Sequence, residues 1–201
     1  SHQFHLVITG DEAGLICVWD VRSGHQAFRF EHGSRLTAMH LDTSGRKLMT
    51  GGADGDVRLW NYSSGEELKQ ISSYEAPKVE VTALLHIHLP KVSYFVSVGW
   101  GRDVWMWPDR REERGQAHPR RLVGHTEDIL CVAFCPPNLL FSGAYDGTLI
   151  SHSIESGAIN KRVPPKRRDD AAIESGDPVA FAHSLAIETM VVLDPQRQVL
   201  P

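Results

Sequence analysis

The sequence contains little cysteine, no long apolar run and no strong excess of either charge. Its three cysteines are sparse and odd in number, which argues against a disulfide framework and indicates a reducing compartment. No apolar run approaches the ~18 residues that a membrane helix needs. The formal net charge of −4 gives no attraction to nucleic acid. We therefore expect an intracellular, cytoplasmic protein that neither inserts into membranes nor binds nucleic acid.

The motifs that mark enzymes and cofactor sites are also missing. The chain has no Gly-x-Ser-x-Gly elbow, and Gly99-Trp100-Gly101 lacks the spacing of a dinucleotide-binding loop. His86 and His88 alternate on one predicted strand, but two imidazoles without further ligands are too few for zinc. We expect no catalytic residues, no cofactor and no metal site.

What the sequence does contain is a repeated hairpin. Residues 51–61 place an Asp-Gly pair between two short apolar strands, which is a strong hairpin signal. The second strand ends at Trp60, with Trp19 lying 41 residues before it and Trp107 lying 47 residues after it. His152 holds the same place another 45 residues on. A period in the forties, with one hairpin per unit, is typical of four-stranded propeller blades.

These units resemble the WD40-repeat family over residues 4 to about 163. The matching segments are Trp19-Asp20, Ala53-Asp54-Gly55, Trp60-Asn61, Gly124-His125-Thr126 and Tyr145-Asp146-Gly147. The resemblance implies an all-β, WD40-type β-propeller of about four to four and a half blades, as a fragment of a larger, seven-bladed propeller. We expect repeats at about 4–33, 34–77, 78–125 and 126–163, a mobile loop at about 164–184, and the start of a fifth repeat at 185–201. A polar insertion at 108–116 is expected to be a solvated loop.

The resemblance also implies that a set of hydrogen-bonded side chains stabilises each blade. The set consists of a histidine before the first strand, a hydroxyl on the second strand, a turn aspartate and a tryptophan. The second unit carries all four, and the fourth carries three with His152 in the tryptophan position. The members are His32, Thr50, Asp54 and Trp60, then His125, Ser142 and Asp146. We expect the aspartates to be buried acceptors. This network explains the histidine, serine and aspartate of the fourth unit better than a catalytic triad does.

A closer likeness links two segments to a group of ciliary and flagellar WD-repeat proteins, some of which carry an EF-hand. The segments are residues 97–102 and 124–137. The likeness implies a structural or docking component of the ciliary axoneme, with axonemal or other cytoskeletal partners. The chain itself has no EF-hand loop.

A non-catalytic protein–protein interaction scaffold is the favoured function, because every recognisable polar set has a structural role. The alternatives are an enzyme that uses the central channel of the propeller and a general cytoplasmic or nuclear WD40 adaptor. In WD40 propellers the turns between second and third strands open on one face. Here these turns carry Glu12, Trp100, Arg102 and Tyr145. Grouped aromatic and arginine side chains are typical of binding hot spots, so we expect this face to bind a protein partner.

Overall fold

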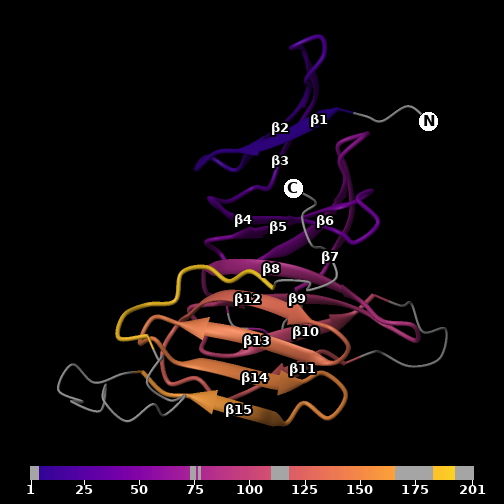
Figure 1. Cartoon of the computed structure of the whole chain (residues 1–201). Helices are drawn as coiled ribbons and strands as arrows, with labels where there is room; N and C mark the ends of the chain where they lie inside the picture. Colours follow the sequence, from indigo (N-terminus) through magenta and orange to yellow (C-terminus); the bar gives the residue numbers. More distant parts are fainter. Residues whose placement is uncertain (1–4, 73–75, 77, 110–117, 166–182, 193–201) are drawn as a thin grey trace, which may run out of the picture.

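Every regular element in the described part of the chain is a β-strand. The computed structural model describes residues 5–72, 76, 78–109, 118–165 and 183–192. Fifteen strands form four antiparallel sheets that follow one another along the sequence. Figure 1 shows β1–β3 at the top, β4–β7 below them, and the sheets β8–β11 and β12–β15 overlapping at the bottom. The expected all-β propeller-blade architecture is confirmed.

Each sheet is one blade, and the blades are numbered in chain order. Blade 1 has three strands, β1 (Leu6–Gly10), β2 (Leu15–Asp20) and β3 (Gln26–Glu31). Blade 2 has β4 (Leu36–Leu41), β5 (Leu48–Gly52), β6 (Val57–Asn61) and β7 (Glu66–Gln70). Blade 3 has β8 (Val81–His88), β9 (Ser93–Gly99), β10 (Val104–Pro108) and β11 (Arg120–Leu122). Blade 4 has β12 (Ile129–Cys135), β13 (Leu139–Ala144), β14 (Leu149–Ser153) and β15 (Ile159–Val163).

The turn between the second and third strands of blades 2–4, and the corresponding turn between β1 and β2 of blade 1, requires one residue with positive φ. Gly14, Gly55 and Gly147 supply it in three blades, with φ of 87°, 83° and 86°. Arg102 supplies it in blade 3 with φ of 62°, a conformation that costs a side-chain-bearing residue more than glycine. The Asp-Gly signal in the sequence therefore specifies the turns of blades 2 and 4 but not that of blade 3.

The first strands of the four-stranded blades lie next to one another, as expected for strands around a propeller axis. The strand β8 packs between β4 and β12. Each of these inner strands begins with a one-residue bulge, at Thr37, Thr82 and Leu130. The bulge fixes which side chains of the strand face the preceding blade and which face the following one.

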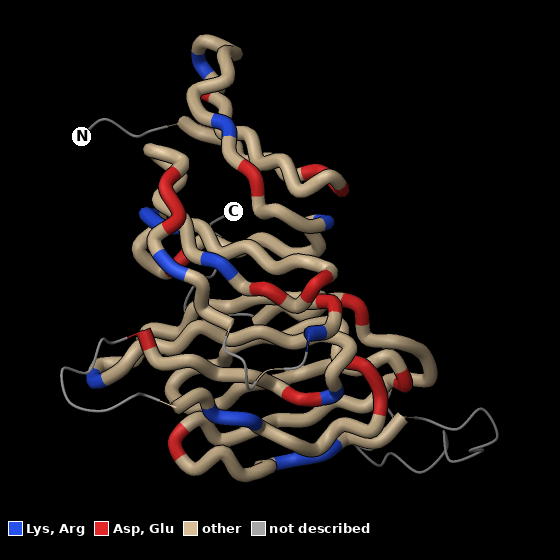
Figure 2. Tube along the Cα trace, turned by 180° about the vertical axis from the view of Figure 1, so that it is seen from behind, with Lys and Arg blue, Asp and Glu red and all other residues tan. Residues whose placement is uncertain are grey.

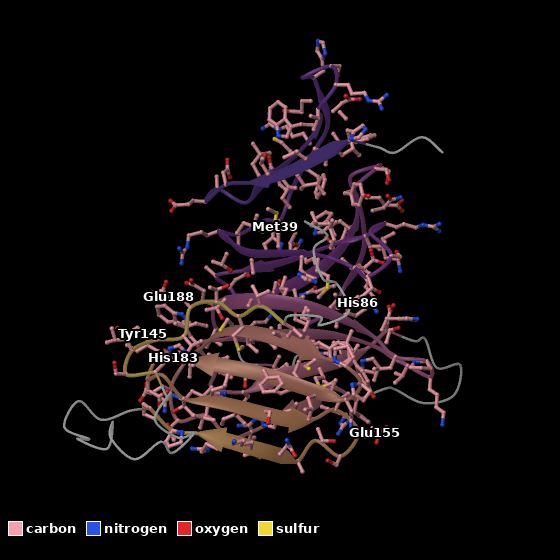
Figure 3. The ribbon with its side chains drawn as sticks, in the orientation of Figure 1. Met39, His86, Tyr145, Glu155, His183 and Glu188 are labelled. Atoms are coloured by element: carbon pink, nitrogen blue, oxygen red, sulfur yellow. The ribbon has the colours of Figure 1, made fainter. Side chains whose placement is uncertain are left out.

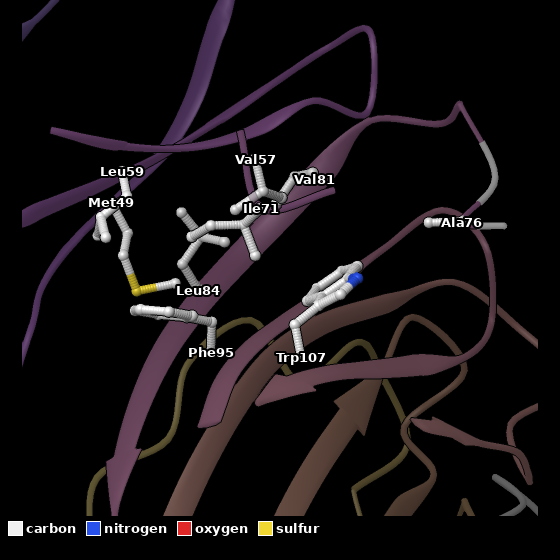
Figure 4. Packing of buried hydrophobic residues seen from close by; sticks show 9 residues of the cluster. All are labelled: Met49, Val57, Leu59, Ile71, Ala76, Val81, Leu84, Phe95 and Trp107. Carbon is white, nitrogen blue, oxygen red and sulfur yellow. The ribbon is translucent and has the colours of Figure 1, made fainter. Parts of the chain in front are cut away.

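Apolar side chains fill the space between neighbouring blades. Figure 4 shows the core between blades 2 and 3, where Met49 and Leu59 lie near Leu84 and Phe95. The cores between blades 1 and 2 and between blades 3 and 4 are built in the same way. Basic and acidic positions are interspersed along the described part of the trace in Figure 2. The described residues include no helix that could cross a membrane.

One expected strand does not form. Residues 183–192 contain no strand, although the fifth repeat expected to start at 185–201 would place its first strand there. Ile187 instead donates its backbone N–H to Ala144 O at 3.1 Å and accepts the Cys131 thiol at 3.1 Å. The expectation was wrong for the described residues because apolar alternation becomes a strand only where a second strand pairs with it. The expected loop at 164–184 and the insertion at 108–116 lie largely outside the described residues.

Candidate functional site

The turns between second and third strands form one face together with the segments that lead from each blade into the next, and we call it the turn face. His32 donates its backbone N–H to Gly14 O at 2.8 Å, so the segment entering blade 2 lies over the turn of blade 1. A Cβ added at Gly55 would lie 2.8 Å from the Val79 nitrogen. One added at Gly147 would lie 2.8 Å from the carbonyl oxygens of His183 and Leu185. Backbone this close leaves room only for glycine in these turns.

Two large aromatic side chains are exposed on the turn face. Trp100 is 56% exposed in the turn of blade 3, and Tyr145 is 66% exposed in the turn of blade 4. Arg102 is also exposed, two residues after Trp100. Glu12 is exposed in the turn of blade 1, which blade 2 separates from the other three residues. The structure therefore places Trp100, Arg102 and Tyr145 on neighbouring blades and leaves Glu12 apart from them.

The segment after blade 4 adds apolar surface that sequence reasoning did not assign to a site. Leu185 is 67% exposed and follows His183, which lies over the turn of blade 4. Figure 3 shows Tyr145, His183 and Glu188 at one end of the blades and Glu155 and His86 at the other end. The apolar pattern of residues 185–192 was visible in the sequence, but it was interpreted as a strand rather than as surface.

A buried network in blade 2 centres on Thr50. Trp60 donates its indole Nε1–H to Thr50 Oγ1 across 2.7 Å, and His32 Nδ1 lies 2.8 Å from the same oxygen. All three side chains are buried. The hydroxyl accepts the indole hydrogen and still has a hydrogen and a second lone pair, so it can bond to His32 Nδ1 in either ring tautomer. Burial lowers the pKa of His32 and so keeps the ring neutral.

Asp54 is not the buried acceptor that the sequence led us to expect. Its carboxylate is exposed and accepts the backbone N–H of Asp56 at 3.0 Å. His32 Nε2 is buried and has no hydrogen-bond partner among the described residues. A Cβ added at Gly52 would lie 2.5 Å from both His32 Nε2 and Asp54 Oδ1, so the two atoms flank this glycine. The expectation was wrong because the carboxylate caps its own turn at the solvent-facing end of the blade.

Blade 4 contains a related but different set. His125 Nε2 lies 2.7 Å from Ser142 Oγ, and burial lowers the pKa of His125 to about 4. Asp146 is half-buried and accepts the backbone N–H of Thr148 at 2.8 Å, so it also caps its turn. His152 occupies the tryptophan position and donates Nε2–H to Val123 O at 3.2 Å. A carbonyl can only accept, which assigns the proton of this ring to Nε2.

Blade 1 has a hydroxyl–indole pair that we did not anticipate. Trp19 donates its Nε1–H to Thr9 Oγ1 at 2.9 Å, although Ala13 replaces the turn aspartate. The hydroxyl and the indole are ten residues apart, as Thr50 and Trp60 are, and this spacing could have revealed the pair. Blade 3 has the same spacing, yet Trp107 Nε1 has no hydrogen-bond partner among the described residues.

The polar sets do not form an accessible reactive site. A serine–histidine pair could start nucleophilic chemistry, but Ser142 is fully buried and His125 nearly so. His86 is buried and accepts the Thr43 backbone N–H on Nδ1, whereas His88 is exposed. Throughout the described ranges, no three His, Cys, Asp or Glu side chains gather closely enough to hold a metal ion.

Comparison with known proteins identifies the repeats. The family model "WD domain, G-beta repeat" matches residues 24–61 and 117–151. The "WD repeat-containing protein on Y chromosome" of Drosophila willistoni is 27% identical over 82% of this chain, which covers 16% of that protein. The "Eukaryotic translation initiation factor 3 subunit I" of Bombyx mori is 28% identical over 74% of this chain and 47% of that protein.

The fold comparison agrees with the repeat match. The crystal structure of the computationally designed Ika8 protein matches with a TM-score of 0.69 at 22% identity, over 96% of this chain and 52% of that chain. The chain spans less than half the length of the natural relatives it matches. Residues 24–61 and 117–151 thus match WD40 repeats, and the four blades of the expected topology and the WD-repeat relatives support the WD40-repeat family for the chain.

Proposed function

We propose that this chain is a non-catalytic scaffold that binds a protein partner on the turn face of blades 3 and 4. WD-repeat proteins generally act as scaffolds for protein interactions. The observation that carries the proposal is the exposure of Trp100 and Tyr145 on adjacent turns. Two large aromatic side chains exposed to water contribute no free energy from burial. A protein partner that covers them gains binding free energy by burying their apolar surface and also meets the nearby charge of Arg102.

The buried polar groups support a structural rather than a reactive role. Thr50, Trp60 and His32 bond to one another inside blade 2, and Ser142 is closed off from solvent. Among the residues that the structure describes, no polar set is left at an accessible position that would need a catalytic explanation. Binding without turnover is the function that these residues fit best.

The test combines Trp100→Ala with Arg102→Glu in a tagged chain and compares the proteins captured from a cell extract. We expect the double variant to lose partners of the parent while its melting curve stays nearly unchanged. The matched control combines Ile159→Ala with Lys161→Glu on the outer strand β15, which should capture the same partners as the parent. If the turn-face variant still captures every partner, binding occurs on another surface.

We further propose that the partner is a filament or scaffold component of the ciliary axoneme and that the protein acts in the cytoplasm or cilium. The support is the likeness of residues 97–102 and 124–137 to ciliary WD-repeat proteins. A general cytoplasmic adaptor is the second candidate, supported by the 28% identity to a translation initiation factor subunit. Proximity labelling in ciliated cells separates the two, because axonemal proteins should be enriched under the first proposal and initiation-complex proteins under the second.

A further inference from the structure

His86 joins two neighbouring blades at the end of the molecule opposite the turn face (Figure 3). It lies on the inner strand β8 of blade 3, and its side chain is only 6% exposed. Its Nδ1 atom lies 3.1 Å from the backbone nitrogen of Thr43, in the turn between β4 and β5 of blade 2. A backbone N–H can only donate, so Nδ1 is unprotonated and the neutral ring carries its proton on Nε2.

The proton on Nε2 has no hydrogen-bond partner among the described residues, although the atom is buried. A carboxylate oxygen, Oδ2 of Asp109, lies 3.9 Å from Nε2, which is beyond hydrogen-bond distance. Asp109 follows β10 and donates its backbone N–H to Ser93 O at 2.8 Å, so the residue is held at this end of blade 3. The ring therefore has one bonded nitrogen and one buried N–H that lies near a carboxylate without bonding to it.

A proton added to Nδ1 cannot coexist with the bond from Thr43. Two hydrogens would then meet between Nδ1 and the backbone nitrogen, so the charged ring loses the bond that the neutral ring accepts. The hydroxyl Oγ1 of the same threonine also lies 3.1 Å from Nδ1 and can accept the new N–H. On the other side of the ring, the charged Nε2–H attracts Asp109, because a charged donor and a carboxylate form a stronger bond. The ring thus has a different set of partners in each charge state.

Charged groups from both blades surround the imidazole ring. The carboxylates of Asp42 in blade 2 and Asp109 in blade 3 interact favourably with its charged form. The opposing positive charges are those of Lys47 and Lys69, which lie near Asp109. Burial, and after it the charge of the neighbouring ring, lower the pKa of His40 on β4, so His40 stays neutral to a lower pH than an unperturbed histidine. A charged ring is therefore attracted to one carboxylate of each blade.

The bond to His86 links the turn between β4 and β5 to the next blade. Within blade 2, Asp42 accepts two backbone N–H groups of its own turn at 2.8 Å, and the Tyr62 hydroxyl donates to Gly45 O at 2.6 Å. For the described part of the chain, the two contacts from Thr43 to His86 are the hydrogen bonds that join this turn to blade 3. Losing the backbone bond therefore loosens the junction between the blades without unfolding the turn.

We propose that His86 forms a pH-dependent link between blades 2 and 3. Above the pH range in which histidines titrate, the neutral ring accepts the Thr43 N–H and joins the turn of blade 2 to blade 3. Below that range, the imidazolium bonds to Asp109 and to the Thr43 hydroxyl, and the backbone N–H is released. Acidification from about pH 8 to about pH 5 thus loosens the junction at the end opposite the turn face.

The first test identifies the ring tautomer by nuclear magnetic resonance of the chain with isotope-labelled histidine. At about pH 8 we expect the His86 ring to have a protonated Nε2 and an unprotonated Nδ1. The ring signals are assigned by their loss in the variant His86→Gln. A neutral ring with its proton on Nδ1 would overturn the proposal, because that ring cannot accept the Thr43 N–H.

The second test measures hydrogen exchange at the Thr43 amide between about pH 8 and about pH 5, corrected for the pH dependence of exchange in an unfolded peptide. We expect its protection to fall about tenfold on acidification, the effect of losing one hydrogen bond. Asp109→Asn should move the midpoint of this fall to lower pH, because it removes a negative charge that favours the imidazolium. Constant protection over this range in the parent chain would contradict the proposal.

The matched control is His40→Gln, which removes the other titratable ring near this turn. The fall in Thr43 protection should remain in this variant. In His86→Gln the protection should no longer vary with pH, because a glutamine side chain does not titrate. If the fall persists in His86→Gln or disappears in His40→Gln, another group controls the junction and the proposal is wrong.

Discussion

The substitution Thr50→Val tests the buried network of blade 2. Valine keeps the shape of threonine but removes the oxygen that lies 2.7 Å from Trp60 Nε1 and 2.8 Å from His32 Nδ1. Both ring atoms are buried, so water cannot replace the lost partner without opening the core between blades. Leaving a buried polar group unpaired costs about 1–3 kcal/mol. With two groups affected, we expect the free energy of unfolding to fall by about 2–4 kcal/mol.

The matched control is Thr9→Val in blade 1. Thr9 accepts the same kind of bond from Trp19 at 2.9 Å, but its side chain is exposed and water can take its place. We expect this change to cost less than about 1 kcal/mol. Urea unfolding, followed by far-ultraviolet circular dichroism with a common m value, measures both differences. Equal losses for the two variants would refute the reasoning, because burial would then not decide the cost.

Three further outcomes are expected. Burial lowers the pKa of His125 to about 4, so the unfolded chain takes up the proton first as the pH falls from 6.5. His125 should therefore contribute a loss of at most about 3 kcal/mol of stability in urea between pH 6.5 and 4, and His125→Asn should make the slope shallower, with the lowered pKa values of His32 and His152 accounting for part of what remains. Arg102→Gly should raise the melting temperature slightly by relieving the positive φ, whereas Gly55→Ala should lower it strongly because its Cβ would meet backbone at 2.8 Å. Asp54→Ala should cost only about 0.5–1 kcal/mol, since the carboxylate is exposed; a loss as large as that of Thr50→Val would contradict its role as a turn cap.

The blades could be predicted because the residues that specify each hairpin lie close together in the sequence. An Asp-Gly pair between two apolar strands specifies a hairpin, and the regular return of an aromatic residue after each hairpin specifies the repeat. The four strands of blade 2, from β4 (Leu36–Leu41) to β7 (Glu66–Gln70), lie inside the repeat expected at about 34–77. The partnership of Thr50 with Trp60 is also local, because antiparallel pairing brings residues ten apart in a hairpin onto neighbouring strands.

The remainder depends on contacts between segments far apart in the sequence. The position of Asp54 at the solvent-facing end of the blade decides its exposure, and the turn motif does not encode it. The apolar pattern of residues 185–192 predicts a strand, but only a neighbouring strand can make it one. Arg102 was expected on the turn face, yet its positive φ could not be predicted, because arginine has no preference for that conformation.

Photo-crosslinking from the turn face tests the central claim most directly. A photoreactive phenylalanine analogue is placed at position 145 in one chain and at position 155 in another, since Tyr145 and Glu155 lie at opposite ends of blade 4 (Figure 3) and both are exposed. Each chain is irradiated in cells, and the captured proteins are identified by mass spectrometry. A scaffold that docks its partner on the turn face predicts a specific cross-linked protein from position 145 and none from position 155. The same partner captured only from position 155 would contradict it.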